Sequence, residues 1–126
     1  MTLVIDASAA YGLLLGNQWD AVLENNSELV APDLIVAELL NTRWKIARSG
    51  GLTPGLESIL DFLGRVRIMP SLPYAAVAAE LSERLKHPVY DCVYVALARQ
   101  ENVKLLTSDA HLARKLRSHK LSAVLA

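Results

Sequence analysis

The feature that most limits the fold of this chain is the alternation of short apolar runs with longer segments of helical spacing. Each run has four or five residues, nearly all of them apolar: TLVI (2–5), ELVA (28–31), VRIM (66–69), VKLLT (103–107) and LSAVL (121–125). Continuous hydrophobicity is typical of a strand that is buried on both faces, as in a parallel sheet. The pattern therefore predicts an α/β fold, with a mostly parallel sheet of about five strands and helices on both of its faces.

The segments between the runs carry the signals that begin and end helices. Proline stands where a first helical turn is expected, and Ser49-Gly50-Gly51 is a strong stop. We expect helices over residues 9–16, 18–26, 33–49, from 53 onward, 71–86, 88–102 and 110–119. The chain shows no repeat, linker or low-complexity segment. With 126 residues it is expected to form a single domain over 1–126.

The composition excludes several classes of protein. With 52% hydrophobic and 21% charged residues, the chain can fill a core and is not disordered by composition. Its one cysteine rules out a disulfide framework or a zinc set built on cysteines. No signal peptide is visible, and no apolar run approaches the roughly 18 residues of a membrane span, so a cytoplasmic protein with no membrane association is the expectation.

The net charge is zero, so no global electrostatic signature points to a nucleic-acid partner. The distribution of charge is more informative. Residues 1–62 carry eight acids and three bases, whereas residues 63–126 carry five acids and ten bases. This asymmetry is compatible with an acidic centre beside a basic wall.

Four acids are expected at one edge of the predicted sheet. Asp6 follows the first run directly, and Asp109 comes two residues after Thr107, at the end of the fourth run. Glu38 lies in a mid-helix position among apolar neighbours, and Asp91 lies in the first turn of a helix that is apolar nearly all round. Functional groups of open α/β sheets gather outside the carboxyl ends of the strands, where these acids would meet if the first and fourth strands are neighbours.

Simpler roles account for some of these acids singly. Asp6 and Asp109 could be helix N-caps, and Asp91 could gain from the dipole of its helix. Glu38 could pair with a remote base, although no Lys or Arg stands three or four residues away. Capping does not explain all four together, because neighbouring carboxylates repel each other unless a cation holds them. Oxygen ligands without His or Cys suit Mg²⁺ or Mn²⁺, which points to metal-assisted phosphodiester chemistry.

The chain resembles a PIN domain, and specifically a VapC-type ribonuclease toxin. The resemblance rests on four pieces in order: LVIDAS (3–8), APDLIVAELLN (31–41), YDCVYVALA (90–98) and LLTSDAHL (105–112). It implies a Rossmann-like three-layer arrangement and an endoribonuclease dependent on Mg²⁺ or Mn²⁺. It also implies an RNA substrate, a VapB-like antitoxin that blocks the site, and a homodimer.

The resemblance also implies roles for individual residues. Metal would be held by the four acids, with Glu38 as a ligand or as the base that positions water. Ser8 and Thr107 match small hydroxyl positions beside the acids, and Asn41 would orient Glu38 or the substrate. The family often has a further charged residue after the fourth acid. Here Ala110-His111 stands there, which puts a second ion in doubt and favours one tightly held ion, with the number, one or two, left open.

Surface roles are less strongly indicated. Arg114, Lys115 and Arg117 could form a phosphate-binding wall, or simply a solvated helix face. Tyr11 and Trp44 are predicted to line a groove for an apolar antitoxin segment, a hypothesis that full burial of both tryptophans would remove. Residues 73–85 could form the homodimer face or pack as an ordinary helix. Finally, His87 and His111 are expected at loop or cap positions in contact with solvent, not as metal ligands.

Two alternatives remain open at this stage. Another Mg²⁺-dependent phosphohydrolase on an α/β fold, such as a haloacid dehalogenase-like phosphatase, would need a second Asp two residues after the first, and Ser8 stands there. A receiver domain would need an acid pair before its phosphorylated Asp and a late Lys, and neither pattern is present. A non-catalytic α/β binding domain would be expected to have lost one of the acids, and all four are present.

Overall fold

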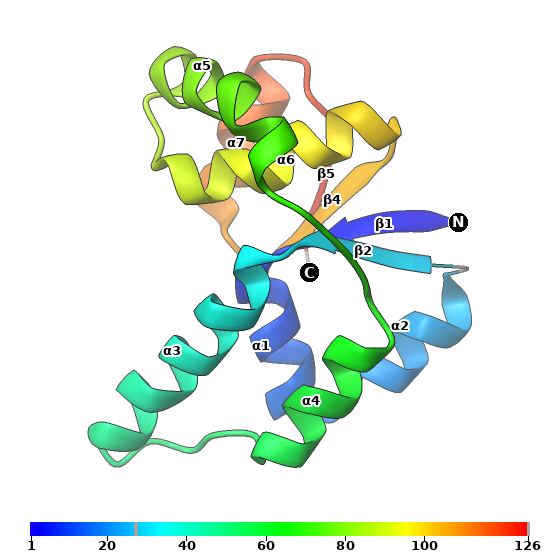
Figure 1. Ribbon diagram of the computed structural model, residues 1–126, viewed down its shortest axis with the longest axis vertical. Coiled ribbons are helices and arrows are strands. Elements are labelled where there is room, and N and C mark those ends of the chain that lie inside the picture. Colours follow the sequence, from blue (N-terminus) through cyan, green and yellow to red (C-terminus); the bar gives the residue numbers. More distant parts are fainter. Residues whose placement is uncertain (27, 126) are drawn as a thin grey trace.

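One parallel sheet forms the centre of the molecule. The computed structural model describes residues 1–26 and 28–125 and orders the strands β3-β2-β1-β4-β5, all neighbours parallel (Figure 1). The strands are β1 (Thr2–Ile5), β2 (Glu28–Pro32), β3 (Arg67–Met69), β4 (Lys104–Thr107) and β5 (Ala123–Leu125). The predicted α/β class with a parallel sheet of about five strands is confirmed, and each strand lies on the apolar run that predicted it.

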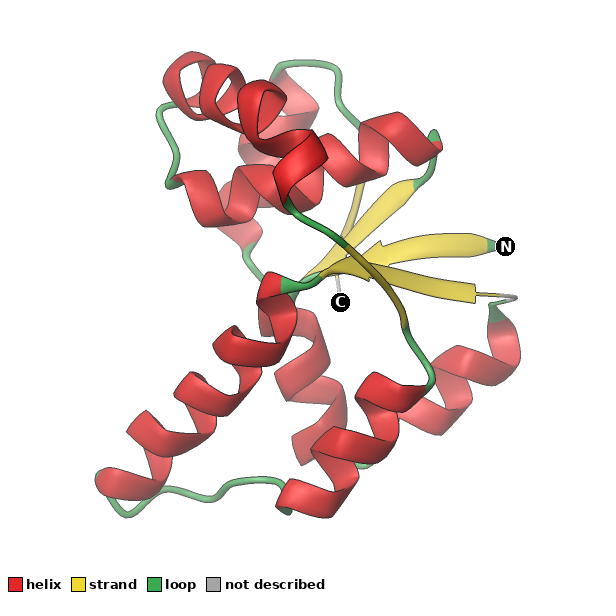
Figure 2. Ribbon diagram, viewed as in Figure 1, coloured by secondary structure: helices red, strands yellow, loops and turns green. Residues whose placement is uncertain are grey.

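Helices cover both faces of this sheet, which gives three layers (Figure 2). On one side lie α1 (Ala7–Leu15), α2 (Trp19–Asn25), α3 (Leu34–Arg48) and α4 (Leu56–Gly64). On the other side lie the short 3-10 helix η1 (Leu72–Tyr74), α5 (Ala75–Leu85), α6 (Val89–Glu101) and α7 (Ala110–Ser118). The helix expected from residue 53 begins later, at Leu56, and Pro54 before it is buried in the connecting loop.

The central strands and helix α6 make the core. Val4, Ile5, Val30 and Leu105 are fully buried, as the continuous apolar runs predict. Helix α6 contacts β1, β2 and β4, and residues 92–98 of this helix are all buried. Helix α5 packs along α6 in an outer position. Asp91, in the first turn of α6, is therefore carried across the carboxyl ends of the central strands.

The strand order places the crevice of the sheet beside β1. This strand pairs with β2 on one side and with β4 on the other. The turns that follow β1 and β4 therefore lie next to each other. The backbone N–H of Asp6 donates to the Leu106 carbonyl at 3.1 Å, which extends the ladder by one residue beyond β1. The expected adjacency of the first and fourth strands is thus confirmed. None of the described helices has both the length and the apolar character needed to span a membrane.

Candidate active site

Asp6 is a buried carboxylate at the point where β1 passes into α1. Its side chain is 4% exposed. One oxygen, Oδ1, accepts the backbone N–H of Ala9 at 2.9 Å, so Asp6 is the N-cap of α1, and it also accepts the Ser8 hydroxyl at 2.7 Å. The hydroxyl of the buried Thr107 lowers the pKa of this carboxyl group and lies 3.4 Å from the Ser8 hydroxyl. Ser8 and Thr107 therefore lie beside this acid as predicted.

Asp109 occupies the corresponding position after β4. Its Oδ1 accepts the backbone N–H of Leu112 at 3.0 Å, which makes Asp109 the N-cap of α7. Its own N–H donates to the Thr107 hydroxyl at 3.1 Å, and that hydroxyl lies 3.4 Å from the hydroxyl of Ser8. A small hydroxyl network thus joins the turns after β1 and β4. Asp6 and Asp109 are therefore both helix N-caps, and in each of them one carboxylate oxygen accepts the capping hydrogen bond.

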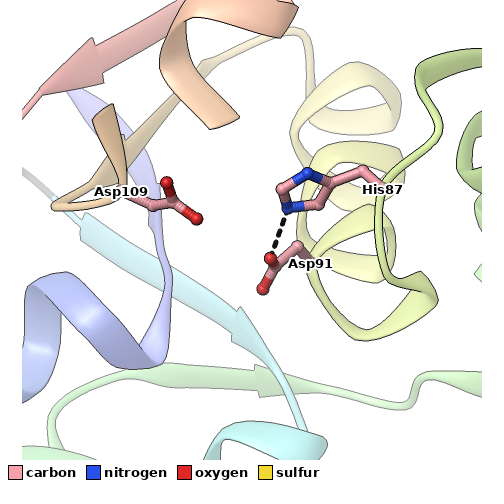
Figure 3. A group of neighbouring side chains, drawn as sticks. All are labelled: His87, Asp91 and Asp109. Atoms are coloured by element: carbon pink, nitrogen blue, oxygen red, sulfur yellow. Dashed lines mark hydrogen bonds and ion pairs between the residues drawn. The ribbon is translucent and has the colours of Figure 1, made fainter. Parts of the chain in front are cut away.

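Asp91 and Asp109 point toward each other across the crevice, together with His87 (Figure 3). One ligand atom from each of these three residues lies within 4.8 Å of the other two. His87 Nε2 is 2.6 Å from Asp91 Oδ2. The expectation that His87 contacts solvent is wrong, because its side chain is buried at 7% exposure and faces the acids. His111 is exposed as expected.

Glu38 reaches the same region from α3 and is held by a tyrosine. The Tyr94 hydroxyl donates to Glu38 Oε1 at 2.6 Å. Tyr94 is almost completely buried in α6, one turn after Asp91. Asn41 is exposed on the next turn of α3, and the residue found to orient Glu38 is Tyr94 instead. Tyr94 lies three residues after Asp91, on the same face of the helix, and this spacing could have indicated that Tyr94 contacts another acid of the site. A tyrosine in an apolar helix is, however, usually part of the core.

Asp6 and Glu38 both have raised pKa values, chiefly because they are buried. Burial raises the pKa of Asp6, the negative charge of Asp91 adds to the effect, and hydrogen bonds from Thr107, Ala9 and Ser8 oppose it. Burial likewise raises the pKa of Glu38, with contributions from the charges of Asp91 and Asp6, against the hydrogen bond from Tyr94. The pKa of the Tyr94 hydroxyl is raised by burial and by this carboxylate, so it remains a donor. Asp6, Glu38 and Asp91 therefore lie close enough to interact electrostatically.

The one basic side chain seen against these carboxylates in the described residues is that of His87, at Asp91. Within residues 1–26 and 28–125, none of the four acids forms an ion pair with Lys or Arg. Their donor atoms are carboxylate oxygens with hydroxyl groups nearby, which is the ligand chemistry of a hard divalent cation. The residues present thus fit a Mg²⁺ or Mn²⁺ ion, which would offset the repulsion among the acids.

An open groove runs from Glu38 along α3. It has a volume of about 820 Å³, and its lining includes Glu38, Leu40, Asn41, Trp44 and Tyr90. Trp44 is 56% exposed there, and Arg48 covers its ring at 4.7 Å. The predicted exposed apolar surface is therefore present on α3.

One residue predicted for this groove does not line it. Tyr11 is buried at 8% exposure, and its hydroxyl donates to the Leu52 carbonyl at 3.4 Å. Trp19 is also buried and packs edge-on against Phe62. The aromatic part of the predicted groove is thus Trp44 with Tyr90, and the assignment of Tyr11 is corrected to the core.

The basic wall on α7 divides into two kinds of residue. Arg114 and Arg117 are exposed, as a phosphate-binding surface requires. Lys115 instead turns inward, where its Nζ donates to the Lys86 carbonyl at 2.8 Å and lies 3.2 Å from His87 Nδ1. The expectation that Lys115 is a free surface cation is therefore corrected.

The sequence matches one family model over most of its length. The model for the PIN domain aligns with residues 3–116, a range that contains all four acids. The chain belongs to the PIN-domain family. A curated relative, Ribonuclease VapC3 of Pyrobaculum aerophilum, is 36% identical over 127 residues, which cover 91% of this chain and 95% of the relative. The resemblance drawn from the four sequence motifs is thus confirmed.

Solved structures show the same fold. The crystal structure of PAE2754 from Pyrobaculum aerophilum has a TM-score of 0.78 at 22% identity, covering 91% of this chain and 84% of that one. VapBC2 from Rickettsia felis, bound to a DNA fragment from their promoter, has a TM-score of 0.63 at 14% identity and covers 100% and 99% of the two chains. At these identities the likeness concerns the PIN fold alone.

Proposed function

We propose that this PIN-domain protein is a metal-dependent endoribonuclease that acts as the toxin of a toxin–antitoxin module. The observation that supports the proposal is the closeness of Asp91 and Asp109, which offer ligand atoms within 4.8 Å of each other, together with the electrostatic interaction of Asp6 and Glu38 with Asp91. Within residues 1–26 and 28–125, none of these four acids pairs with a Lys or Arg. A relative that is named a ribonuclease, and of which this chain covers 95%, supports the same activity.

Each acid has a role that its surroundings suggest. Asp6, Asp91 and Asp109 would hold the ion, each through the carboxylate oxygen that does not accept its helix-cap N–H or contact His87. A bound Mg²⁺ or Mn²⁺ supplies charge neutralisation at the phosphate and makes a nearby water more acidic. Glu38 either joins them as a ligand or orients the attacking water and accepts its proton. The raised pKa of Glu38 suits that second role, because a base works best when its pKa is near the working pH.

The groove and the exposed arginines are the surfaces proposed for partners. Arg114 and Arg117 lie on the helix that begins at Asp109, where they would contact RNA phosphates. The groove beside Trp44 would receive an apolar segment of a VapB-like antitoxin. Solved relatives named VapBC support such a partner. The outer face formed by η1 and α5, where Leu72 and Val77 are exposed, is proposed for a homodimer.

The direct test is RNA cleavage by purified protein with Mg²⁺ or Mn²⁺. We expect wild-type protein to cleave an RNA mixture in the presence of the metal. EDTA should abolish the cleavage, and Asp6→Asn and Asp91→Asn should each reduce it by at least 100-fold. Lys104→Met is the matched control, because this exposed residue lies at the opposite end of β4 and should leave cleavage unchanged.

Expression in cells tests the toxin role separately. The wild type expressed alone should stop growth, and Asp6→Asn should not. Unchanged cleavage by both Asn variants would contradict the assignment of the active site, and would favour a non-catalytic domain contaminated by another nuclease. Equal toxicity of wild type and Asp6→Asn would contradict the toxin role.

A further inference from the structure

We propose that Lys115 and His87 form a hydrogen-bonded relay that holds the Asp91 carboxylate in the orientation needed for metal binding. In this arrangement His87 is a positioning residue, not a metal ligand. The inference rests on the proposed function, because it assigns to Asp91 the role of holding the ion. It concerns residues outside the four acids and explains why a histidine is buried at the edge of the crevice.

The backbone of His87 is held by hydrogen bonds of its own. Its backbone N–H donates to the Ser82 carbonyl at 3.2 Å, and the Ser82 hydroxyl donates to the backbone carbonyl of His87 at 2.6 Å. The preceding residue, Lys86, ends α5 in the left-handed conformation, with φ of 53°. The buried imidazole is thus carried by a backbone that is clamped between α5 and α6, four residues before Asp91.

Both nitrogens of the ring are occupied, and their partners define the tautomer. Lys115 Nζ is 3.2 Å from Nδ1, and a lysine ammonium can only donate, so Nδ1 must accept. The proton of the neutral ring is then on Nε2, which donates to Asp91 Oδ2 at 2.6 Å. The lysine is itself held by the Lys86 carbonyl at 2.8 Å. The direction of the relay therefore runs from Lys115 through His87 to Asp91.

These hydrogen bonds indicate that His87 is not itself a metal ligand, although it contacts Asp91. The proximity of His87, Asp91 and Asp109 alone would also suit a three-residue metal site. A histidine binds a metal through an unprotonated ring nitrogen, however, and the one such nitrogen here accepts from Lys115 on the side away from Asp91. Asp91 Oδ2 is taken by the ring, which leaves Oδ1 for an ion. Hydrogen bonds of this kind commonly orient ligating carboxylates in metal sites.

The relay also joins the two helices that carry adjacent acids. Asp91 lies in the first turn of α6, and Asp109 is the N-cap of α7, the helix to which Lys115 belongs. The chain of contacts from Lys115 to Asp91 therefore ties α7 to the start of α6. Its loss should loosen the spacing between the two carboxylates as well as the orientation of one of them.

The experiment measures binding of Mn²⁺ alone to the full-length chain, by calorimetry and by electron paramagnetic resonance. His87→Phe keeps a ring of similar size but removes both hydrogen bonds, and we expect it to weaken Mn²⁺ binding by 10- to 100-fold. His87→Gln places an amide N–H near the position of Nε2 and should restore affinity to within about 3-fold of wild type. Lys115→Met should weaken binding by several-fold, whereas the matched control Lys104→Met should not change it.

The variants separate a failure of this inference from a failure of the proposed function. If Asp91→Asn binds Mn²⁺ as tightly as the wild type, the metal site itself is wrongly assigned. If Asp91→Asn loses affinity but His87→Phe does not, or if His87→Gln is as weak as His87→Phe, the relay is overturned and the metal site stands.

Two spectroscopic readouts need no variant that might fail to fold. The ¹⁵N chemical shifts of His87 in wild-type protein should show a ring protonated at Nε2 alone, and protonation at Nδ1 alone or at both nitrogens would contradict the relay. In the Mn²⁺-loaded protein, electron spin echo measurements should show no nitrogen bound to the ion. A directly coupled histidine nitrogen would show that His87 is a ligand and would overturn the proposal.

Discussion

At the scale of single residues, Asp6 and Glu38 are acids whose charged form is unfavourable in the folded protein. Asp6 is buried with its charge facing that of Asp91, and burial also raises the pKa of Glu38. Hydrogen bonds from hydroxyl and backbone groups offset part of this penalty. The remainder can be relieved by a cation, so the residues that serve function should destabilise the protein when no metal is bound.

The first prediction concerns the pH dependence of stability without metal. The folded protein holds a proton on Asp6 to higher pH than the unfolded chain does, because its pKa is raised above 3.8. The contribution of Asp6 to the free energy of unfolding should therefore be largest below that value and fall as the pH rises through the raised pKa. Asp6→Asn removes the charge, and its Oδ1 can still cap α1.

In EDTA at pH 7.5, Asp6→Asn should therefore be more stable than wild type, by about 1.4 kcal/mol for each unit by which the pKa is raised. The difference should shrink as the pH approaches 4. Urea unfolding at a series of pH values measures it. A variant that is less stable than wild type at pH 7.5 would contradict the account of a strained charge.

The second prediction concerns Tyr94, whose hydroxyl holds Glu38. Tyr94→Phe removes a hydrogen bond that lowers the pKa of Glu38, so this pKa should rise further. If Glu38 accepts a proton from water, the acidic limb of the pH profile of kcat should move to higher pH, and kcat/KM should fall by about 10-fold. An unshifted profile with full activity would argue against a catalytic role for this pair.

At the scale of elements, α1 and α7 begin at Asp6 and Asp109, so capping and the proposed metal binding would share the same side chains. Asp6 and Asp109 each give one oxygen to a backbone N–H and keep the other. Either role alone would explain an acid at the end of a strand, and for this reason the sequence left both interpretations open. The structure shows that capping does occur and that it does not exclude a metal-binding role.

The third prediction separates these two roles at Asp109. Asp109→Ala removes the cap of α7 and should lower the free energy of unfolding by about 1 kcal/mol, whereas Asp109→Asn should preserve the cap at little cost. Both variants should lose RNA cleavage to a similar extent, because neither retains the carboxylate. Chemical denaturation and a cleavage assay on the same preparations test this. Full activity in Asp109→Asn would mean that Asp109 serves only as a cap.

The strands and most of the helices could be predicted because each has a local sequence signal, which is a continuous apolar run or a capping residue. The partners of the acids could not, since they come from distant positions. From the sequence Tyr94 would be taken as a core residue, because its partner Glu38 is 56 residues away in the chain. Lys115 would be taken as a surface charge, because its contact with His87 spans 28 residues. Tyr11 would be assigned to a groove, because its contact with Leu52 is also distant in sequence.

At the scale of the whole molecule, the order of the strands produces the site. Placing β4 beside β1 brings the turns after both strands together, and α6 crosses above them with Asp91 in its first turn. Helix α3, which contains Glu38, lies on the other side of the sheet from α6 (Figure 1). Four segments that are dispersed over about a hundred residues of sequence therefore converge only when the complete sheet has formed. Metal binding should consequently be coupled to the stability of the whole fold.

The fourth prediction follows from that coupling. An ion that binds only the folded protein should stabilise it by about 2.7 kcal/mol at a concentration 100 times its Kd. Thermal unfolding with Mg²⁺ or Mn²⁺ should show a rise in Tm that EDTA reverses. The rise should be absent in Asp91→Asn, and NaCl at the same ionic strength controls for screening. An equal rise in Asp91→Asn would indicate binding elsewhere.

The most direct test of the central claim is the position of Mn²⁺ in crystals of this protein. Anomalous diffraction should show a strong peak in the crevice between β1 and β4, within bonding distance of carboxylate oxygens of Asp6, Asp91 and Asp109 and beside Glu38. Wild-type crystals with no peak there, while Mn²⁺ is bound at other surface acids, would contradict the account.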